Sequence, residues 1–202
     1  MEKYRTAILL AGPILYCLAM FIQPGDNADA KAWIGIIRAY SMYWQLGHVL
    51  AAVSLLGLSV FIADVHGAAM EGDEWQAFWG AALSGLAIIA SYASAMFQPV
   101  GFDLLQLSPE DAQRVLELMD ASGYLTAFVT VPILGFVIGF GLFAMALVKA
   151  GRSLWQPAFL FNAGLFTALA TVLNLQFMHW IGGSALLAFA WLHVNMPLSQ
   201  ER

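Results

Sequence analysis

Long stretches of this 202-residue sequence contain no charged side chain. Asp, Glu, Lys and Arg together make up 10% of the residues, whereas soluble domains carry roughly 25%. A charge at the centre of a membrane span costs at least about 2.5 kcal/mol, so charge-free stretches are typical of membrane helices. These absences exclude an ordinary soluble domain. The charge-free stretches are residues 6–25, 39–63, 75–102, 121–148 and 153–200.

Cysteine and basic residues are also scarce. Cys17 is the only cysteine, which excludes a disulfide framework or a thiolate metal cluster within one chain. The net charge is −5 and the 8 Lys and Arg residues are scattered, so no basic patch exists to neutralise phosphates. We therefore expect no nucleic-acid partner. The expected partners are membrane lipids and either another membrane subunit or a second copy of this chain.

Hydrophobic residues make up 61% of the sequence. A helix needs about 20 apolar residues to cross about 30 Å of hydrocarbon. The first four charge-free stretches each hold one span, and the last must fold back to hold two. We predict an all-α, polytopic transmembrane bundle of six helices in one domain, 1–202. The predicted spans are 6–22, 44–64, 75–97, 124–148, 155–174 and 177–196.

Six spans place both termini on one side of the membrane, which we call face A. Face A also carries the expected loops 65–74 and 149–154, and the opposite side, face B, carries 23–43 and 98–123. Face A has more Lys and Arg than face B, which favours face A as the cytoplasmic side. The basic residues of face A are Lys3, Arg5, Lys149, Arg152 and Arg202, and those of face B are Lys31, Arg38 and Arg114.

Two spans end in the same way, at Gln23-Pro24 and at Gln98-Pro99, and each is followed by an acidic residue. Each of these corners leads into a short amphipathic segment, 27–42 or 108–121, and then into another span. We expect both short helices to lie flat at face B. Two explanations stay open. Residues 6–64 and 75–148 are an internal repeat, or the same helix-ending signal is used twice, because the residue before proline avoids the helical conformation.

The second short helix carries the clearer local signals. Ser108 is a suitable cap, Pro109 suits the first helical position, and Asp111 lies at the capping-box position. Together with the run Leu147-Val148-Lys149-Ala150-Gly151-Arg152-Ser153-Leu154-Trp155-Gln156-Pro157, this layout resembles a widespread bacterial family of six-helix integral membrane proteins with no assigned chemistry. The resemblance implies the topology and no activity. We separately expect the protein in a bacterial-type cytoplasmic (inner) membrane.

Four histidines could hold a haem. His179 and His193 are 14 residues apart, about 21 Å along a helix, similar to the spacing in dihaem cytochrome b helices. On the partner helix His48 and His66 are 18 residues apart, about 27 Å, which places His66 in the expected loop 65–74. A single haem b held by His48 and His179 is therefore favoured over a second haem on His66 and His193.

A polar layer at face B is the alternative use of these side chains. We expect it to gather His48, His179 and the oxygen ligands of the two Gln-Pro corners, a set that suits a divalent metal or acid–base work on a lipid. The corner residues are Gln23, Asp26, Gln98 and Asp103. Asn162 is the interior polar residue expected to face the bundle.

Three functions stay open from the sequence. The first is a protein that binds a lipophilic ligand or a partner membrane subunit, which the uncharged spans and the lack of a catalytic motif favour. The second is a b-type haem protein of electron transfer. The third is an intramembrane enzyme that modifies a lipid or quinone at the Gln23 and Gln98 corners. An ion pump or a proton-coupled transporter is disfavoured, because such proteins need ionisable groups within the membrane.

Overall fold

The structure, a computed structural model, describes residues 2–22, 30–97, 106–121, 123–173 and 175–196. Every regular element in these ranges is a helix, and six helices are long and apolar enough to cross a membrane. The predicted all-α class with six spans is therefore confirmed. The six long helices are α1 (Glu2–Ile22), α3 (Ser41–Met70), α4 (Glu74–Phe97), α7 (Tyr124–Lys149), α8 (Trp155–Leu173) and α9 (Gln176–Asn195).

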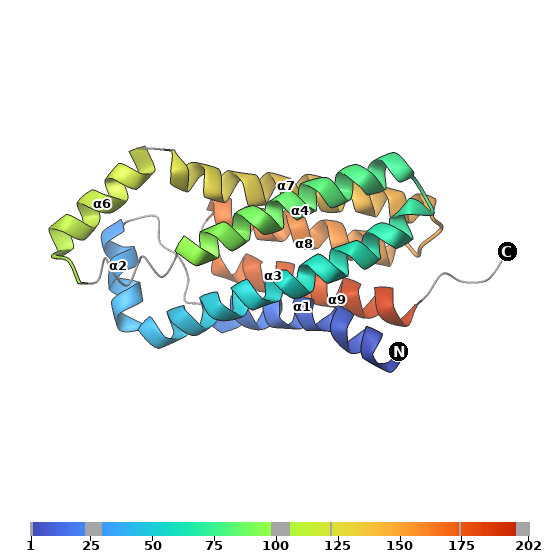
Figure 1. The fold of residues 1–202 in the computed structure, drawn as a ribbon, viewed down its shortest axis with the longest axis horizontal. Coiled ribbons are helices and arrows are strands. Elements are labelled where there is room, and N and C mark those ends of the chain that lie inside the picture. Colours follow the sequence, from blue (N-terminus) through green and yellow to red (C-terminus); the bar gives the residue numbers. More distant parts are fainter. Residues whose placement is uncertain (1, 23–29, 98–105, 122, 174, 197–202) are drawn as a thin grey trace.

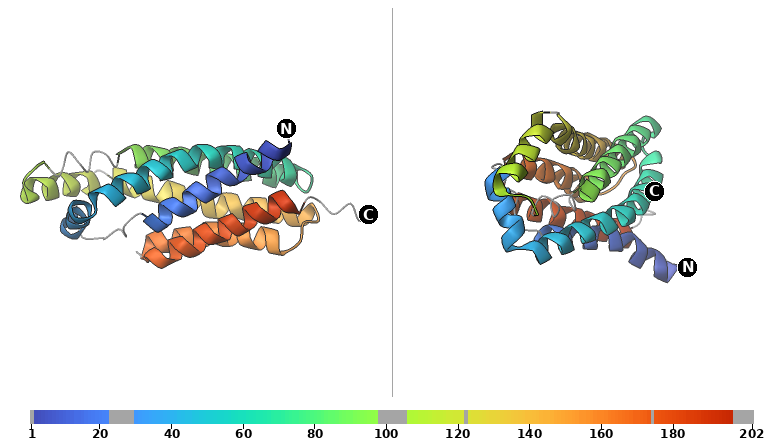
Figure 2. Two further views of the ribbon diagram at one scale, coloured as in Figure 1. Left: turned by 90° about the horizontal axis from the view of Figure 1, so that it is seen from below. Right: turned by 60° about the vertical axis from the view of Figure 1, so that its left-hand side comes forward.

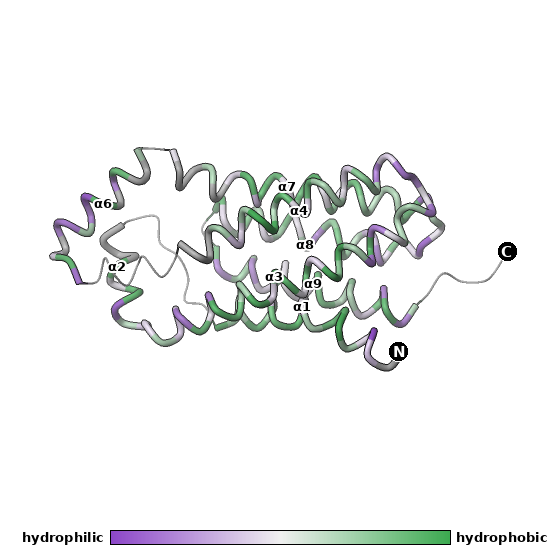
Figure 3. Tube along the Cα trace, viewed as in Figure 1, coloured by the Kyte–Doolittle hydropathy of each residue, from purple (hydrophilic) through white to green (hydrophobic). Residues whose placement is uncertain are grey.

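The six long helices form a closed ring. Neighbours pack in the order α1, α3, α4, α7, α8 and α9, and α9 packs back against α1. α1 begins and α9 ends at the same end of the bundle (Figure 1), which is face A. Apolar residues follow the length of the bundle, while hydrophilic residues lie mainly towards its two ends (Figure 3). The centre of the ring is filled by large side chains such as Phe61, Phe143 and Phe189.

Glycine allows these helices to approach closely at defined points. A Cβ atom on Gly12 of α1 would lie 2.4 Å from the backbone of Gly57 on α3, so these two helices touch backbone to backbone. A Cβ atom on Gly139 of α7 would lie 2.4 Å from Ser84 Oγ of α4. Gly85, another small residue of α4, meets nothing within 4 Å. Small residues thus mark helix contacts at some positions and open space at others.

The loop predicted at residues 65–74 is wrong over most of its length. α3 continues to Met70, so His66 is helical and the expected loop 65–74 shrinks to a short turn before α4. The extension persists because Val65 and Ala69, one turn apart, are buried in the core. With 30 residues, α3 is about 45 Å long, which exceeds the hydrocarbon thickness and carries its last turns towards the headgroups.

Two short helices lie at face B, beyond the ends of α1 and α4 (Figures 1 and 2). They are α2 (Ala30–Ala39) and α6 (Pro109–Ala121), and they contact each other. The predicted cap of α6 is confirmed: the Asp111 N–H donates to Ser108 Oγ at 3.1 Å, and the Ser108 hydroxyl donates to the Asp111 carboxylate at 2.8 Å. The order span, short helix, span occurs twice, and the internal repeat stays a prediction.

Candidate functional site

A cluster of charged and polar side chains joins α1, α3 and α9 at face A. Asp64 of α3 is its centre. Its carboxylate accepts hydrogen bonds from Arg5 Nη2, at 2.8 and 3.0 Å, and from His193 Nε2, at 2.9 Å. The three side chains are 61% (Arg5), 23% (Asp64) and 3% (His193) exposed. The cluster therefore runs from the surface of the bundle at Arg5 to its interior at His193.

The buried imidazole is held by its neighbours. The ring of His193 packs edge-on to Phe61, with centroids 5.9 Å apart, and lies 5.4 Å from the ring of Phe189. An imidazole that donates one N–H to a carboxylate has a fixed orientation and a fixed tautomer. When neutral, His193 carries its proton on Nε2, towards Asp64, and presents a lone pair at Nδ1.

The turn between α7 and α8 places further polar groups beside this cluster. Gly151 has φ 78°, and the N–H groups of Gly151 and Arg152 donate to Val148 O and Leu147 O. This is the Schellman arrangement that ends a helix with a left-handed residue. It directs Arg152 towards the end of α9, where Arg152 Nη1 donates to Met196 O at 3.0 Å.

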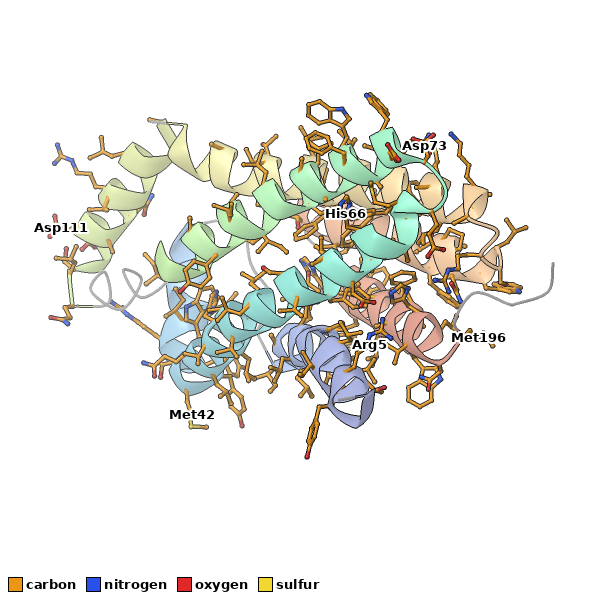
Figure 4. All side chains as sticks on the ribbon, turned by 45° about the vertical axis from the view of Figure 1, so that its right-hand side comes forward. Arg5, Met42, His66, Asp73, Asp111 and Met196 are labelled. Carbon is orange, nitrogen blue, oxygen red and sulfur yellow. The ribbon has the colours of Figure 1, made fainter. Side chains whose placement is uncertain are left out.

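Gln156, in the first turn of α8, reaches the same carbonyl. Its Nε2 donates to Met196 O at 3.4 Å, and His193 lies one helical turn before Met196 on α9. Figure 4 labels Met196 near Arg5 at this end of the bundle. Arg152, Gln156 and His193 thus surround one corner of face A, and we call them the polar corner.

The polar corner contains buried atoms without hydrogen-bond partners. Among the residues that the structure describes, Arg152 Nε, Gln156 Oε1 and His193 Nδ1 are all buried and unpaired. Such atoms are rare in proteins and usually indicate an unseen water or a functional role. Arg152 lies in the turn outside the spans, and burial lowers the pKa of its guanidinium, although Glu71 and Asp64 counteract this effect.

A groove on the outer surface leads to the other side of Asp64. It lies between α1 and α3, has a volume of about 550 Å³ and is open to the surroundings. Ligand sites in proteins commonly measure about 300–1,000 Å³. Arg5 and Asp64 form its polar part. Its remaining lining residues are Tyr4, Ile8, Leu9, Val60 and Ala63.

The middle of the bundle offers much less room. A cavity of about 10 Å³ lies among α1, α3, α7, α8 and α9, enough for roughly one water molecule. Tyr16 and Thr167 line this cavity, and the Thr167 hydroxyl donates to Ala163 O of its own helix. A lipid-sized ligand therefore fits the groove and not this interior cavity.

A separate ion pair closes the turn between α3 and α4. Lys149 Nζ donates to Asp73 Oδ2 at 2.6 Å, and Asp73 also accepts the N–H of Gln76. These bonds lower the pKa of the Asp73 carboxyl, with Lys149 as the largest cause. The pair ties the α3–α4 turn to the end of α7.

Only two of the six candidate site residues at face B, His48 and His179, lie within the described ranges. Gln23, Asp26, Gln98 and Asp103 lie outside the described residues. His48 is buried, and its Nδ1 is 2.7 Å from Trp44 O. His179 Nδ1 is buried without a hydrogen-bond partner in the described part of the chain. The metal site and the haem on His48 and His179 stay predictions. In the ranges described, no group of three or more His, Cys, Asp or Glu could hold a metal ion.

The other predicted residues have different surroundings from those expected. His66 Nδ1 is 3.1 Å from Ala77 O of α4, and His193 Nε2 binds Asp64. A haem on these two histidines would require the bond between His193 and Asp64 to break. Asn162 is half-buried, and its amide donates to Ala158 O of its own helix, so it does not link neighbouring helices.

Sequence reasoning missed Asp64. From the sequence it marks the end of the second span, because it follows directly after the charge-free stretch 39–63. The expected uncharged interior is wrong at this position, since Asp64 lies inside α3 and reaches the buried His193. One signal could have found it: Asp64 and His193 are both preceded by long apolar runs that end at face A.

Comparisons with family models, curated proteins and solved structures found no match to this chain.

Proposed function

We propose that this multi-pass membrane protein binds an amphipathic, lipid-like molecule in the groove between α1 and α3. One observation carries the proposal: a groove of ligand size joins an apolar wall to a charged pair. The apolar part of the ligand lies along Ile8, Leu9 and Val60. Its polar head lies at Arg5 and Asp64.

The position of the groove favours a lipid over a polypeptide. Its residues belong to the first turns of α1 and the later turns of α3, where a membrane changes from hydrocarbon to headgroups. Arg5 uses one nitrogen, Nη2, to bind Asp64, so its other guanidinium N–H groups can donate to a head group. Basic side chains between helices near the cytoplasmic surface are a known form of lipid recognition.

The proposed location is the cytoplasmic membrane of a bacterium, with face A inside. Arg5, Lys149 and Arg152 all lie at face A in the structure. Their position agrees with the preference of Lys and Arg for cytoplasmic loops. The groove would then open towards the inner leaflet.

Native mass spectrometry of the purified protein tests the proposal. Wild type is expected to retain a small lipid adduct. Ala63→Trp fills the groove and should reduce the adduct at least tenfold, which corresponds to about 1.4 kcal/mol. Ile89→Trp is the matched control, because Ile89 is 68% exposed on α4, away from the groove. Equal adducts in all three proteins would contradict the proposal, and a retained polypeptide would identify a partner subunit instead.

A further inference from the structure

The carboxylate of Asp64 connects two environments. It lines the outer groove, and it also accepts the Nε2–H of the buried His193. Hydrogen bonds therefore run from the outer groove to His193, and the buried, unpaired atoms of Arg152 and Gln156 lie at the same corner of face A.

We propose that the groove takes an anionic amphiphile, and that its head group binds together with one proton, which is held by His193. The inference rests on the proposed groove ligand and adds its chemical class: an anionic head group on an apolar chain. The proton comes from water at face A and forms an N–H bond at Nδ1 of His193. The head group binds as its anion beside Arg5.

Charge balance is the first reason for this coupling. Without a ligand, the charges of Arg5 and Asp64 cancel, and His193 can stay neutral. An anionic head group at Arg5 adds one negative charge beside the Asp64 carboxylate, and two like charges at such short range repel each other. A proton on His193 restores neutrality, and Asp64 is already in contact with the imidazolium that forms.

The polar corner supplies the second reason. A protonated Nδ1 needs a hydrogen-bond acceptor, and Gln156 Oε1 is a buried acceptor without a partner. The amide orientation is set by Met196 O, which accepts from Gln156 Nε2. An ordered water would join Gln156 Oε1 to Nδ1, since unpaired buried polar atoms commonly hold water.

The charged groups around His193 come from three elements. Burial of the ring is the largest factor and opposes protonation; Asp64 on α3 favours the protonated ring, and Arg152 in the α7–α8 turn and Arg5 on α1 oppose it. Glu71 at the end of α3 attracts Arg152 and so weakens that opposition. A head group that occupies Arg5 shifts this balance towards protonation.

Calorimetric titration of the purified full-length protein in nanodiscs measures this coupling directly. Titration near neutral pH in buffers of different ionisation enthalpy gives the number of protons exchanged for each ligand bound. The probes are laurate and methyl laurate, which share a chain and differ in the ionisable group. Wild type should take up about one proton with laurate and none with the ester.

Variants separate the role of His193 from that of the ligand itself. His193→Gln should bind laurate with uptake near zero, and Asp64→Asn gives the same result if the first variant does not fold. His66→Gln is the matched control, with wild-type proton uptake. Equal uptake in wild type and His193→Gln would show that the ligand carries the proton and would overturn the inference. Failure of both probes to bind would instead overturn the proposed groove ligand.

Discussion

Replacement of Asp64 by alanine should destabilise the protein more than replacement of its exposed partner Arg5 by alanine. The change leaves two groups without an acceptor. Arg5 is 61% exposed, so water replaces its bond and the loss is below about 1 kcal/mol. His193 is 3% exposed, so its Nε2–H stays buried and unpaired, at a cost of about 1–3 kcal/mol. The buried partner therefore dominates the expected loss.

Thermal unfolding in a mild detergent measures this difference. About 2 kcal/mol corresponds to a decrease in Tm of roughly 4–8 °C for a domain of about 200 residues. Arg5→Ala should lower Tm by less than about half of that. Asp64→Asn should recover most of the stability, because its amide oxygen still accepts the Nε2–H of His193. An equal or larger effect of Arg5→Ala would refute the reasoning, since it would place the energy in the exposed ion pair.

Three further predictions concern other parts of the molecule. Gly57→Ala should lower the free energy of unfolding by about 1–3 kcal/mol, because the added methyl group overpacks the helix contact. Gly85 meets open space, so Gly85→Ala should be neutral or stabilising by up to about 1 kcal/mol. Thermal unfolding of both variants tests this difference. Lys149 holds the folded pKa of Asp73 below its ordinary value, so this pair stabilises the protein above the unfolded pKa and is lost as the pH falls through the folded pKa. Asp73→Asn should thus lower Tm at neutral pH, with a difference that closes in acid; a constant difference would contradict it. A haem held by His48 requires a Soret band after expression with added haem, and loss of that band in His48→Ala; a spectrum without the band ends the haem prediction.

Local signals predicted much of the fold. The charge-free stretches located all six spans, because a charge near the middle of a span is costly to bury in hydrocarbon. The cap of α6 was predicted from Ser108 and Asp111, since both partners lie within one turn. Such features need no knowledge of which helices meet.

The polar cluster could not be predicted in the same way. The partners of Asp64 lie 59 residues before it and 129 residues after it. In a sequence, a carboxylate at the end of an apolar run predicts the end of a helix. Only the packing of α1 and α9 near α3 shows that it has partners there. Asp64 contacts Arg5 and His193 because α3 packs beside α1, and α1 packs beside α9; no local sequence pattern shows this packing. For the same reason the sequence placed the candidate site at face B, and the described groove and cluster lie at face A.

The contact between Gly12 and Gly57 has a consequence for the size of the groove. Two crossed helices that touch at one point must separate on either side of it (Figure 2). Ile8 and Leu9 come just before Gly12 on α1, and Val60 and Ala63 come just after Gly57 on α3. The contact between Gly12 and Gly57 therefore sets the width of the groove, although neither glycine lines it. Larger residues at positions 12 and 57 would widen the opening without changing any group that touches the occupant.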